Sequence, residues 1–364
     1  MGDGSLVLVT GAGGYIGSWV VRRLCESGYR VRGTTRSADP STCQNTLHLR
    51  QSMPAHQLQL VSVDLERDAG WEDAVAGCRH VLHVASPFQM RGKYAEDFEG
   101  AFRGPAVEGT RRVLEACARA RSAGPWPESV VVTSSVAAVS GGHDVRAAMR
   151  EGRVFSEADW SIEDGCAPYT RSKLLAEQEA WRVWRSMDPA QRFRLACVNP
   201  GYVHGPPLSA RSARDATSMA VVASLIRPGS VPMVPRIGFP VVDVRDVADA
   251  HVACVSNPDA SGRFLCVARA VWMAEMADWL AADPSQWGGT TKVTTRRAPY
   301  LLLLLASFFL AEAKVAISMW GEENAYDTSR AQNVLGITFR HPRESILDQA
   351  KAMVQLAHPA TDQP

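Results

Sequence analysis

The sequence predicts an α/β fold, in which a doubly wound parallel sheet is followed by a smaller C-terminal lobe. First, short apolar runs suited to buried strands alternate with segments of helical periodicity over about the first 200 residues. Second, a cluster of glycines separates the first apolar run from the first helical segment. Third, this rhythm breaks after Asn199, where prolines become frequent up to Pro240. The second lobe is expected to begin there.

The glycine cluster lies between a predicted strand and a predicted helix. The uncharged run 6–10 is typical of a buried parallel strand, and from Ile16 onward apolar residues recur every four positions, as on one face of a helix. The glycines between them follow the spacing G-x-x-G-x-x-G: Gly11, Gly14 and Gly17. Backbone N–H groups and the helix dipole favour a phosphate at such a turn. The pattern therefore predicts a dinucleotide site, and a plain tight turn is the alternative.

The other elements are predicted from composition and periodicity. Further strands are expected at 29–35, 58–63, 80–85, 129–133 and 193–198, with 263–267 rejoining the sheet. Helices are expected at 71–75, 94–120, 169–187 and 243–256, and an irregular insertion at 141–161. The apolar segment 300–311 is shorter than the roughly 20 residues that a membrane span needs. We expect a buried or substrate-facing helix there, with contact to a membrane surface as the alternative.

Composition excludes several classes of function. The formal net charge is +1 and no block of like charge occurs, so we expect neither nucleic acid nor an anionic membrane as partner. The 8 cysteines form no C-x-x-C pair and no metal-ligand spacing, so no metal site is predicted. Free cysteines in apolar surroundings indicate a reducing compartment, and the start of the chain lacks the features of a signal peptide. A cytoplasmic location is expected.

The end of the second strand predicts which dinucleotide is bound. NAD sites usually carry a carboxylate there for the ribose 2′-hydroxyl, whereas NADP sites tend to carry an arginine. This chain has Arg36 and no acid at that place, so we expect NADPH, with a solvated surface arginine as the alternative. Asp64, after the third strand, is expected either to contact the adenine amino group or to cap a helix.

The candidate chemistry lies on one helix and one strand end. Tyr169 and Lys173 are four residues apart, so both project from the same helical face. A lysine cation near a tyrosine lowers the pKa of the phenol, which otherwise lies near about 10, and so favours acid–base catalysis. Ser134 and Ser135 close the fifth strand at the edge of the sheet where ligands bind. A surface pair is the alternative for Tyr169 and Lys173 alone.

With these residues in place, the chain resembles the extended short-chain dehydrogenase/reductases, in the branch of dihydroflavonol, cinnamoyl-CoA and aldehyde (carbonyl) reductases. Matching stretches lie between about residue 5 and residue 356 and include VTGAGGYIGSWVVRRL, VVVTSSVAAV, YTRSKLLAEQEAW and NPGYVHGP. The resemblance implies a Rossmann fold. We expect an NADP-binding domain at 1–200 plus 240–268 and a substrate-binding lobe at 201–239 plus 269–364.

The resemblance also implies roles for individual residues. The catalytic triad would be Ser135, Tyr169 and Lys173. The cofactor-binding residues would be Gly11, Gly14, Tyr15, Ile16, Gly17, Arg36, Asp64, Leu65, Ala85, Tyr169, Lys173, Pro200 and Val203. For the substrate we expect an apolar cleft that involves Ser86, Phe88, Tyr202 and Phe239.

Two residues depart from the family pattern, and two alternative functions compete with the expected one. Ala106 stands where sugar-nucleotide epimerases usually have asparagine, which favours a reductase, and Val136 replaces a smaller residue near the expected carbonyl. We therefore expect NADPH-dependent reduction of a bulky or aryl aldehyde or ketone to the alcohol by hydride transfer, with Tyr169 as general acid. One rival is a 3β-hydroxysteroid dehydrogenase-type oxidation of a sterol-like alcohol with NAD(P); the other is a redox-sensing binding protein. The resemblance also implies a possible homodimer through the helices at 94–120 and 169–187.

Overall fold

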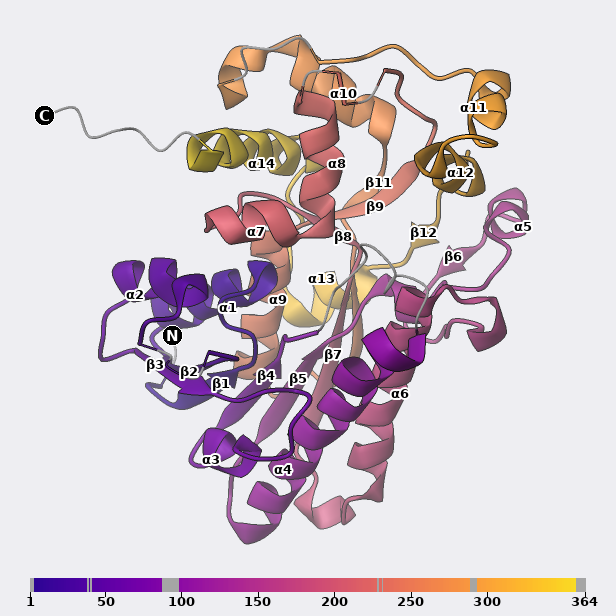
Figure 1. Ribbon diagram of the computed structural model, residues 1–364. Coiled ribbons are helices and arrows are strands. Elements are labelled where there is room, and N and C mark those ends of the chain that lie inside the picture. Colours follow the sequence, from indigo (N-terminus) through magenta and orange to yellow (C-terminus); the bar gives the residue numbers. More distant parts are fainter. Residues whose placement is uncertain are drawn as a thin grey trace, which may run out of the picture.

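A seven-stranded parallel sheet forms the centre of the computed structural model (Figure 1). The structure describes residues 3–37, 39, 41–86, 98–227, 229–230, 232–288 and 293–357. The strands of this sheet are β1 (Leu6–Val9), β2 (Arg30–Thr35), β3 (Leu58–Ser62), β4 (His80–His83), β5 (Ser129–Thr133), β7 (Arg194–Pro200) and β10 (Gly262–Cys266). Their order is β10-β7-β5-β4-β1-β2-β3. The order reverses between β1 and β4, and this reversal is where doubly wound sheets bind their ligands.

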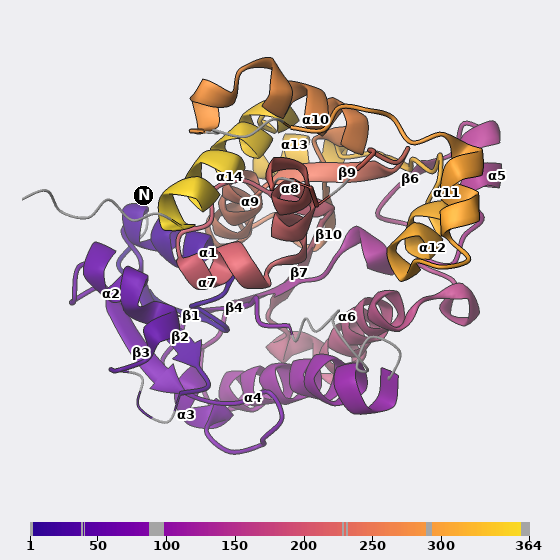
Figure 2. The ribbon, with the colours of Figure 1, turned by 45° about the horizontal axis from the view of Figure 1, so that its top comes forward.

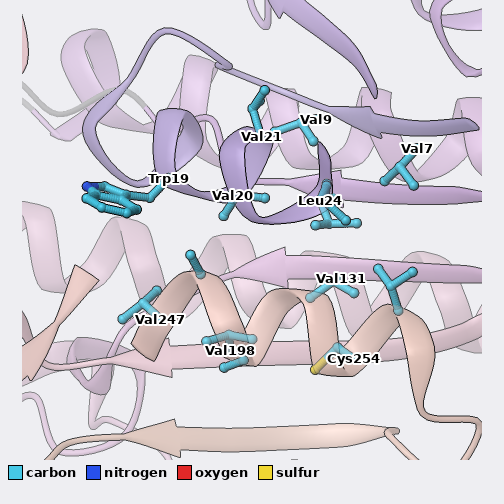
Figure 3. Close-up of a cluster of buried hydrophobic side chains, with 14 of the residues drawn as sticks. Val7, Val9, Trp19, Val20, Val21, Leu24, Val131, Val198, Val247 and Cys254 are labelled. Carbon is cyan, nitrogen blue, oxygen red and sulfur yellow. The ribbon is translucent and has the colours of Figure 1, made fainter. Parts of the chain in front are cut away.

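Helices cover both faces of the sheet (Figure 2). One face carries α1 (Tyr15–Glu26), α9 (Val244–Ser256) and α13 (Ser329–Leu335), and the other carries α3 (Trp71–Val75), α4 (Gly109–Ala123) and α6 (Pro168–Ser186). Figure 3 shows Val20 and Leu24 of α1 and Val247 of α9 close to the sheet side chains Val131 and Val198. All five of these side chains are fully buried. The four-residue apolar repeat of α1 is thus the part of the helix that packs on the sheet.

A second, three-stranded sheet begins where the first one ends. Its strands are β8 (Tyr202–His204), β9 (Gly238–Asp243) and β11 (Arg269–Trp272), in the order β11-β9-β8. Its helices are α7 (Ala210–Asp215), α8 (Thr217–Ile226), α10 (Met273–Ala282) and α14 (Pro342–Ala357). Apolar residues of α8, α10 and α14 form a third core cluster with β9 and β11. Because β7 runs almost directly into β8, this small sheet lies at the carboxyl edge of the large one.

Two of the predicted segments have a different structure. The insertion 141–161 was expected to be irregular, but it contains α5 (Val145–Arg150) and β6 (Val154–Phe155), which pairs with β12 (Ala325–Tyr326). The start of the helix predicted at 94–120 lies outside the described residues, and its described part is a π-helical stretch, Phe98–Glu108, that continues into α4. A short helix, α2 (Leu47–Ser52), lies between β2 and β3.

The apolar segment at 300–311 is not a buried helix. It forms α11 (Tyr300–Ala306), which has no buried residue, and leads into α12 (Ala311–Ser318). Phe308 is 74% exposed and Phe309 is 86% exposed. The prediction of burial was wrong, because α11 packs chiefly on α12 and only Leu303 reaches the third core cluster. Within the described residues, none of the helices has both the length and the apolarity to cross a membrane.

Candidate active site

The glycine turn is shaped to receive a phosphate. Helix α1 begins after Gly14, which has no side chain to cap the first-turn N–H groups, and no acidic residue lies in that turn. Gly14 is exposed, and a Cβ there would meet only the carbonyl oxygen of Gly11, at 3.2 Å. The turn is therefore open toward solvent, with a helix N-terminus behind it. The residues present fit the pyrophosphate of a dinucleotide.

The other glycines of the turn are required by packing. A Cβ at Gly17 would lie 2.2 Å from the carbonyl oxygen of Gly11, and one at Gly13 would lie 2.5 Å from that of Asn45. Gly11 has a φ of +66°, a region that favours glycine. The turn can thus pack against the start of α1 and against the segment of Asn45 only because these side chains are absent.

Arg36 and Asp64 lie where the sequence places them, at the ends of β2 and β3. Arg36 is exposed and makes no hydrogen bond or ion pair with other residues that the structure describes. Asp64 accepts a hydrogen bond from the backbone N–H of Glu66 at 3.0 Å, so its carboxylate already holds the turn after β3. Leu65 lies against Gly109, where a Cβ would be 2.9 Å from the Cβ of Leu65.

Ala85 belongs to a chain of hydrogen bonds across the sheet's central strands. Its backbone N–H donates to Thr10 Oγ1 at 2.9 Å, and Thr10 Oγ1 lies 3.0 Å from Nδ1 of His83. On the other side, Nε2 of His83 lies 3.2 Å from Thr110 Oγ1, which donates to the carbonyl oxygen of Ala106. Because the Thr110 hydroxyl already donates to Ala106, it can only accept from His83. The imidazole proton is therefore assigned to Nε2. Burial lowers the pKa of His83 to about 3, so the ring is neutral.

Ser135, Tyr169 and Lys173 converge from two elements. Tyr169 and Lys173 lie in the first two turns of α6, and Ser135 follows β5 and caps the next short turn by accepting the N–H of Ala137 at 3.1 Å. The Ser135 side chain hydrogen-bonds the Tyr169 phenol. Ser134 is committed elsewhere, because its hydroxyl donates to the buried carboxylate of Glu177 at 2.6 Å. This difference supports Ser135 as the serine of the site.

The pKa of Tyr169 departs from the expectation. Burial raises it above its ordinary value, the neighbouring Tyr202 adds to the rise, and the hydrogen bond from Ser135 opposes it. The prediction that Lys173 lowers the pKa of Tyr169 is therefore wrong for the protein without a bound ligand. Burial also lowers the pKa of Lys173 to about 8, while Glu177 opposes that shift. At neutral pH, Tyr169 carries its proton and Lys173 is mostly charged.

The remaining predicted residues lie around β7 and β8. The carbonyl of Pro200, at the end of β7, lies 3.4 Å from the Ser135 hydroxyl, and Val203 lies on β8. Tyr202 and Phe239 pack with ring centroids 4.8 Å apart, and Phe239 also belongs to the third core cluster. Ser86 follows β4 and is half-buried. Phe88 lies outside the described residues.

Sequence reasoning missed Glu177 and Asn199. Glu177 is four residues beyond Lys173 on α6, so a charged residue on the buried face of that helix was the available signal. Asn199 ends the apolar run of β7 and gave no pattern of its own. In the part of the chain that the structure describes, no cluster of side chains has the composition of a metal site.

Comparison with known proteins decides the family. The model of the NAD dependent epimerase/dehydratase family matches residues 7–267. The chain belongs to this family. Cinnamoyl-CoA reductase 2 of Arabidopsis thaliana is 32% identical over 98% of this chain and 94% of its own length. Tetraketide alpha-pyrone reductase 1 of the same plant is 31% identical over 76% of this chain and 80% of its own length.

Solved structures of epimerase/dehydratase-type reductases share the fold. Gre2 from Candida albicans, solved in complex with NADPH, superposes with a TM-score of 0.76 at 27% identity and covers 97% of this chain and 99% of its own. The predicted family, its reductase branch and the doubly wound fold are thereby confirmed. The chain is an oxidoreductase of the extended short-chain dehydrogenase/reductase type.

Proposed function

We propose that this protein reduces a bulky or aryl aldehyde or ketone to the alcohol, with NADPH as hydride donor and Tyr169 as general acid. The prediction of NADP(H) as cofactor is confirmed by the relatives, among which Gre2 is solved with NADPH. The observation that carries the proposal is that Ser135 meets Tyr169, one helical turn before Lys173 on α6, at the same carboxyl edge of the sheet as the open glycine turn.

Protonation favours the direction of reduction. A general acid must hold its proton until the carbonyl oxygen becomes negative, and burial keeps Tyr169 protonated across the physiological range. Bound NADPH supplies the hydride. Ser135 donates to the same oxygen as Tyr169, and Lys173 places a positive charge close to where the negative charge develops. Oriented donors of this kind are each worth about 3–4 kcal/mol in comparable sites.

Residues at three places support the cofactor assignment. The N-terminus of α1, at Tyr15 and Ile16, would hold the pyrophosphate, and Arg36 would meet the 2′-phosphate because it has no ion-pair partner among the described residues. Asp64, Leu65 and Ala85 would line the adenine and ribose side. Pro200 and Val203 would cover the nicotinamide.

The second lobe, at 201–239 plus 269–364, would supply most of the substrate walls. Tyr202 is half-buried and lies close enough to Tyr169 to raise the pKa of its phenol, so it would touch the substrate beside that phenol. Ser86 would line the opposite side. Phe239 is 5% exposed, so its contribution would be to back Tyr202. A homodimer through α4 and α6 and a cytoplasmic location remain predictions.

The test is NADPH oxidation against a panel of aryl aldehydes, α-keto esters, flavanonols, cinnamoyl-CoA and 3-ketosteroids. We expect turnover with at least one aryl or bulky carbonyl, and with NADPH better than with NADH. Turnover confined to sterol alcohols with NAD⁺ would favour the dehydrogenase rival. NADPH binding without turnover of any compound would favour the redox-sensing protein.

The Tyr169→Phe variant tests the acid directly. Removing the phenolic hydroxyl takes away the proton source and leaves the glycine turn intact, so turnover should fall at least about 100-fold while NADPH still binds. Steady-state assays measure the turnover, and a fluorescence titration measures the binding of NADPH. Turnover equal to that of the unmodified protein would refute the role of Tyr169.

A further inference from the structure

A buried carboxylate lies directly behind the candidate triad. Glu177 has a side chain with 0% exposure and follows Lys173 by one helical turn on α6. Lys173 and Glu177 also line the same small cavity, of about 10 Å³, together with Ser134. A carboxylate in this position is costly unless its charge and both oxygens are satisfied.

Both oxygens of Glu177 accept hydrogen bonds, from three residues elsewhere in the chain and from one residue on the same helix. Oε1 accepts from Nε of Arg263 at 2.6 Å and lies 3.4 Å from the indole nitrogen of Trp181. Oε2 accepts from the Ser134 hydroxyl at 2.6 Å, from Nδ2 of Asn199 at 2.8 Å and from Arg263 at 3.3 Å. Every partner donates, which is the arrangement that a carboxylate with two accepting oxygens requires.

The same network reaches the backbone of the catalytic serine. Nδ2 of Asn199 donates both to Glu177 and to the carbonyl oxygen of Ser135, at 3.2 Å. These two acceptors fix the orientation of the Asn199 amide. Ser134 and Ser135 are therefore held at two points, one through the Ser134 hydroxyl and one through the Ser135 carbonyl, and both points end on the Glu177 carboxylate.

Arg263 links this carboxylate to the insertion at 141–161. Its guanidinium donates to the carbonyl oxygens of Glu157, Asp159 and Ala138, and lies 4.0 Å from the ring centroid of Trp160. One cation on β10 thus anchors the insertion and neutralises Glu177. Arg263 already pairs with the Glu177 carboxylate. The ammonium of Lys173 is therefore a second positive charge close to this one buried carboxylate.

We propose that Glu177 is a positioning residue for the reduction, which fixes the Ser134–Ser135 turn and keeps the ammonium of Lys173 charged. This proposal rests on the proposed function. The titratable and charged groups that face Lys173 and Glu177 are Tyr169 on α6, His83 on β4, Cys197 on β7 and Arg263 on β10. Glu177 is the only anion among them, because burial keeps His83 neutral and raises the pKa of the Cys197 thiol and of the Tyr169 phenol.

The first experiment titrates Lys173 without any substrate. The chain has five lysines, Lys93, Lys173, Lys292, Lys314 and Lys351, so ¹³Cε-labelled lysine gives an assignable NMR spectrum with Lys173→Arg as the reference for assignment. In the unmodified protein we expect the Lys173 signal to titrate near pH 8. In Glu177→Gln the midpoint should fall by about one pH unit or more, because the nearby negative charge is lost. An unchanged midpoint overturns the proposal.

The second experiment measures turnover with a carbonyl identified in the substrate panel. Glu177→Gln should lower kcat about 10- to 100-fold at pH 8, with the alkaline loss of activity moved to lower pH and the KM for the carbonyl little changed. Glu177→Asp keeps the charge and should restore the pH profile in part. A fall in kcat that is the same at every pH would leave Glu177 with a role in the Ser134–Ser135 turn alone and would overturn its proposed role in keeping Lys173 charged.

Two further variants separate this effect from loss of stability. Asp246→Asn removes another buried carboxylate, which pairs with Arg340 on the other face of the sheet, and should leave the Lys173 titration unchanged. If Glu177→Gln fails to fold because Arg263 is left unpaired, the double variant Glu177→Gln/Arg263→Gln removes both charges and takes the same titration. Because the titration needs no substrate, a wrong substrate class leaves this test intact.

Discussion

At Lys173, burial and charge act in opposite directions on the same ammonium group. Burial lowers its pKa to about 8, and Glu177 limits that fall. Tyr169 is buried as well, but its pKa moves upward and away from neutrality. Between about pH 6 and pH 9, Lys173 is therefore the group of the pair that titrates.

This gives a prediction for the pH dependence of turnover. Lys173 is charged below its pKa and loses its charge as pH rises, so kcat for carbonyl reduction should fall above about pH 8. Lys173→Arg keeps a positive charge at every accessible pH, so its lower activity should show no such fall. Steady-state rates from pH 6 to 10 measure this. The same alkaline fall in both proteins would assign it to another group.

Among the helices and strands, α11 is the one whose exposure differs most from what its apolar sequence predicts. Its leucines and the following Phe308 and Phe309 have the composition of a core helix, yet Leu301 is 71% exposed and Leu305 is 62% exposed. The third core cluster, which α11 reaches through Leu303, is filled by other elements, since β9, α10 and α14 bury Val241, Met276 and Ile346 completely.

Stability measurements test this exposure. The double variant Phe308→Ser/Phe309→Ser removes two side chains that lose little solvent contact on folding, so the free energy of unfolding should change by less than about 1 kcal/mol. Phe193→Ala, at a position that is 1% exposed, should cost about 3–5 kcal/mol. Urea unfolding of the three proteins gives both values. A loss above 2 kcal/mol in the double variant would mean that α11 packs against the molecule.

Features that depend on neighbouring residues in this protein can be predicted from sequence, and features that depend on distant residues cannot. The strands, α1 and the shared helical face of Tyr169 and Lys173 follow from local periodicity and spacing, because each depends on residues close in the chain. Glu177 and Arg263 are 86 residues apart, and their pairing is set by the order of strands. Likewise α11 looks buried in sequence, since composition alone does not tell whether a neighbouring element has a free face.

On the scale of the whole molecule, buried histidines connect distant parts of the fold. His80, His204 and His251 have pKa values lowered to about 4 by burial, and that of His83 is about 3. His204 bonds Gln349 of α14 at 2.8 Å, and His251 of α9 bonds Thr133 of β5 at 2.7 Å. Each stays neutral in the folded state, whereas in the unfolded chain it takes up a proton near pH 6.5.

The sign of the resulting pH dependence follows directly. A folded-state pKa below the unfolded one gives stability that is complete above about pH 6.5 and is lost as pH falls toward 4. Burial raises the pKa of Asp246 to about 6 and also raises the pKa values of Asp249 and Glu322. These carboxyl groups act in the opposite direction, but they are fewer than the four histidines. The free energy of unfolding should therefore drop steeply between pH 6.5 and 4.

The variant His251→Gln tests the contribution of one histidine. It keeps a donor and an acceptor at the position but does not titrate, so the slope of unfolding free energy against pH should be smaller by about 1.4 kcal/mol per pH unit. Urea unfolding at pH 7.5, 6.0 and 5.0 gives the slope. Parallel slopes in the two proteins would show that His251 is already charged in the folded state.

Helix α1 has a consequence for protein engineering. Besides presenting its N-terminus at the glycine turn, it donates from the Tyr15 hydroxyl to the carbonyl oxygen of Gly205 at 2.8 Å and from the Trp19 indole to that of Pro206 at 2.8 Å. The chain enters the second lobe at these carbonyls. A substitution at Tyr15 or Trp19 will therefore disturb both the glycine turn and the start of the second lobe, so its effects on cofactor and on substrate cannot be engineered apart. No hydrogen bond or ion pair among the described residues ties Arg36 to the second lobe, so we expect a substitution there to act on the cofactor alone.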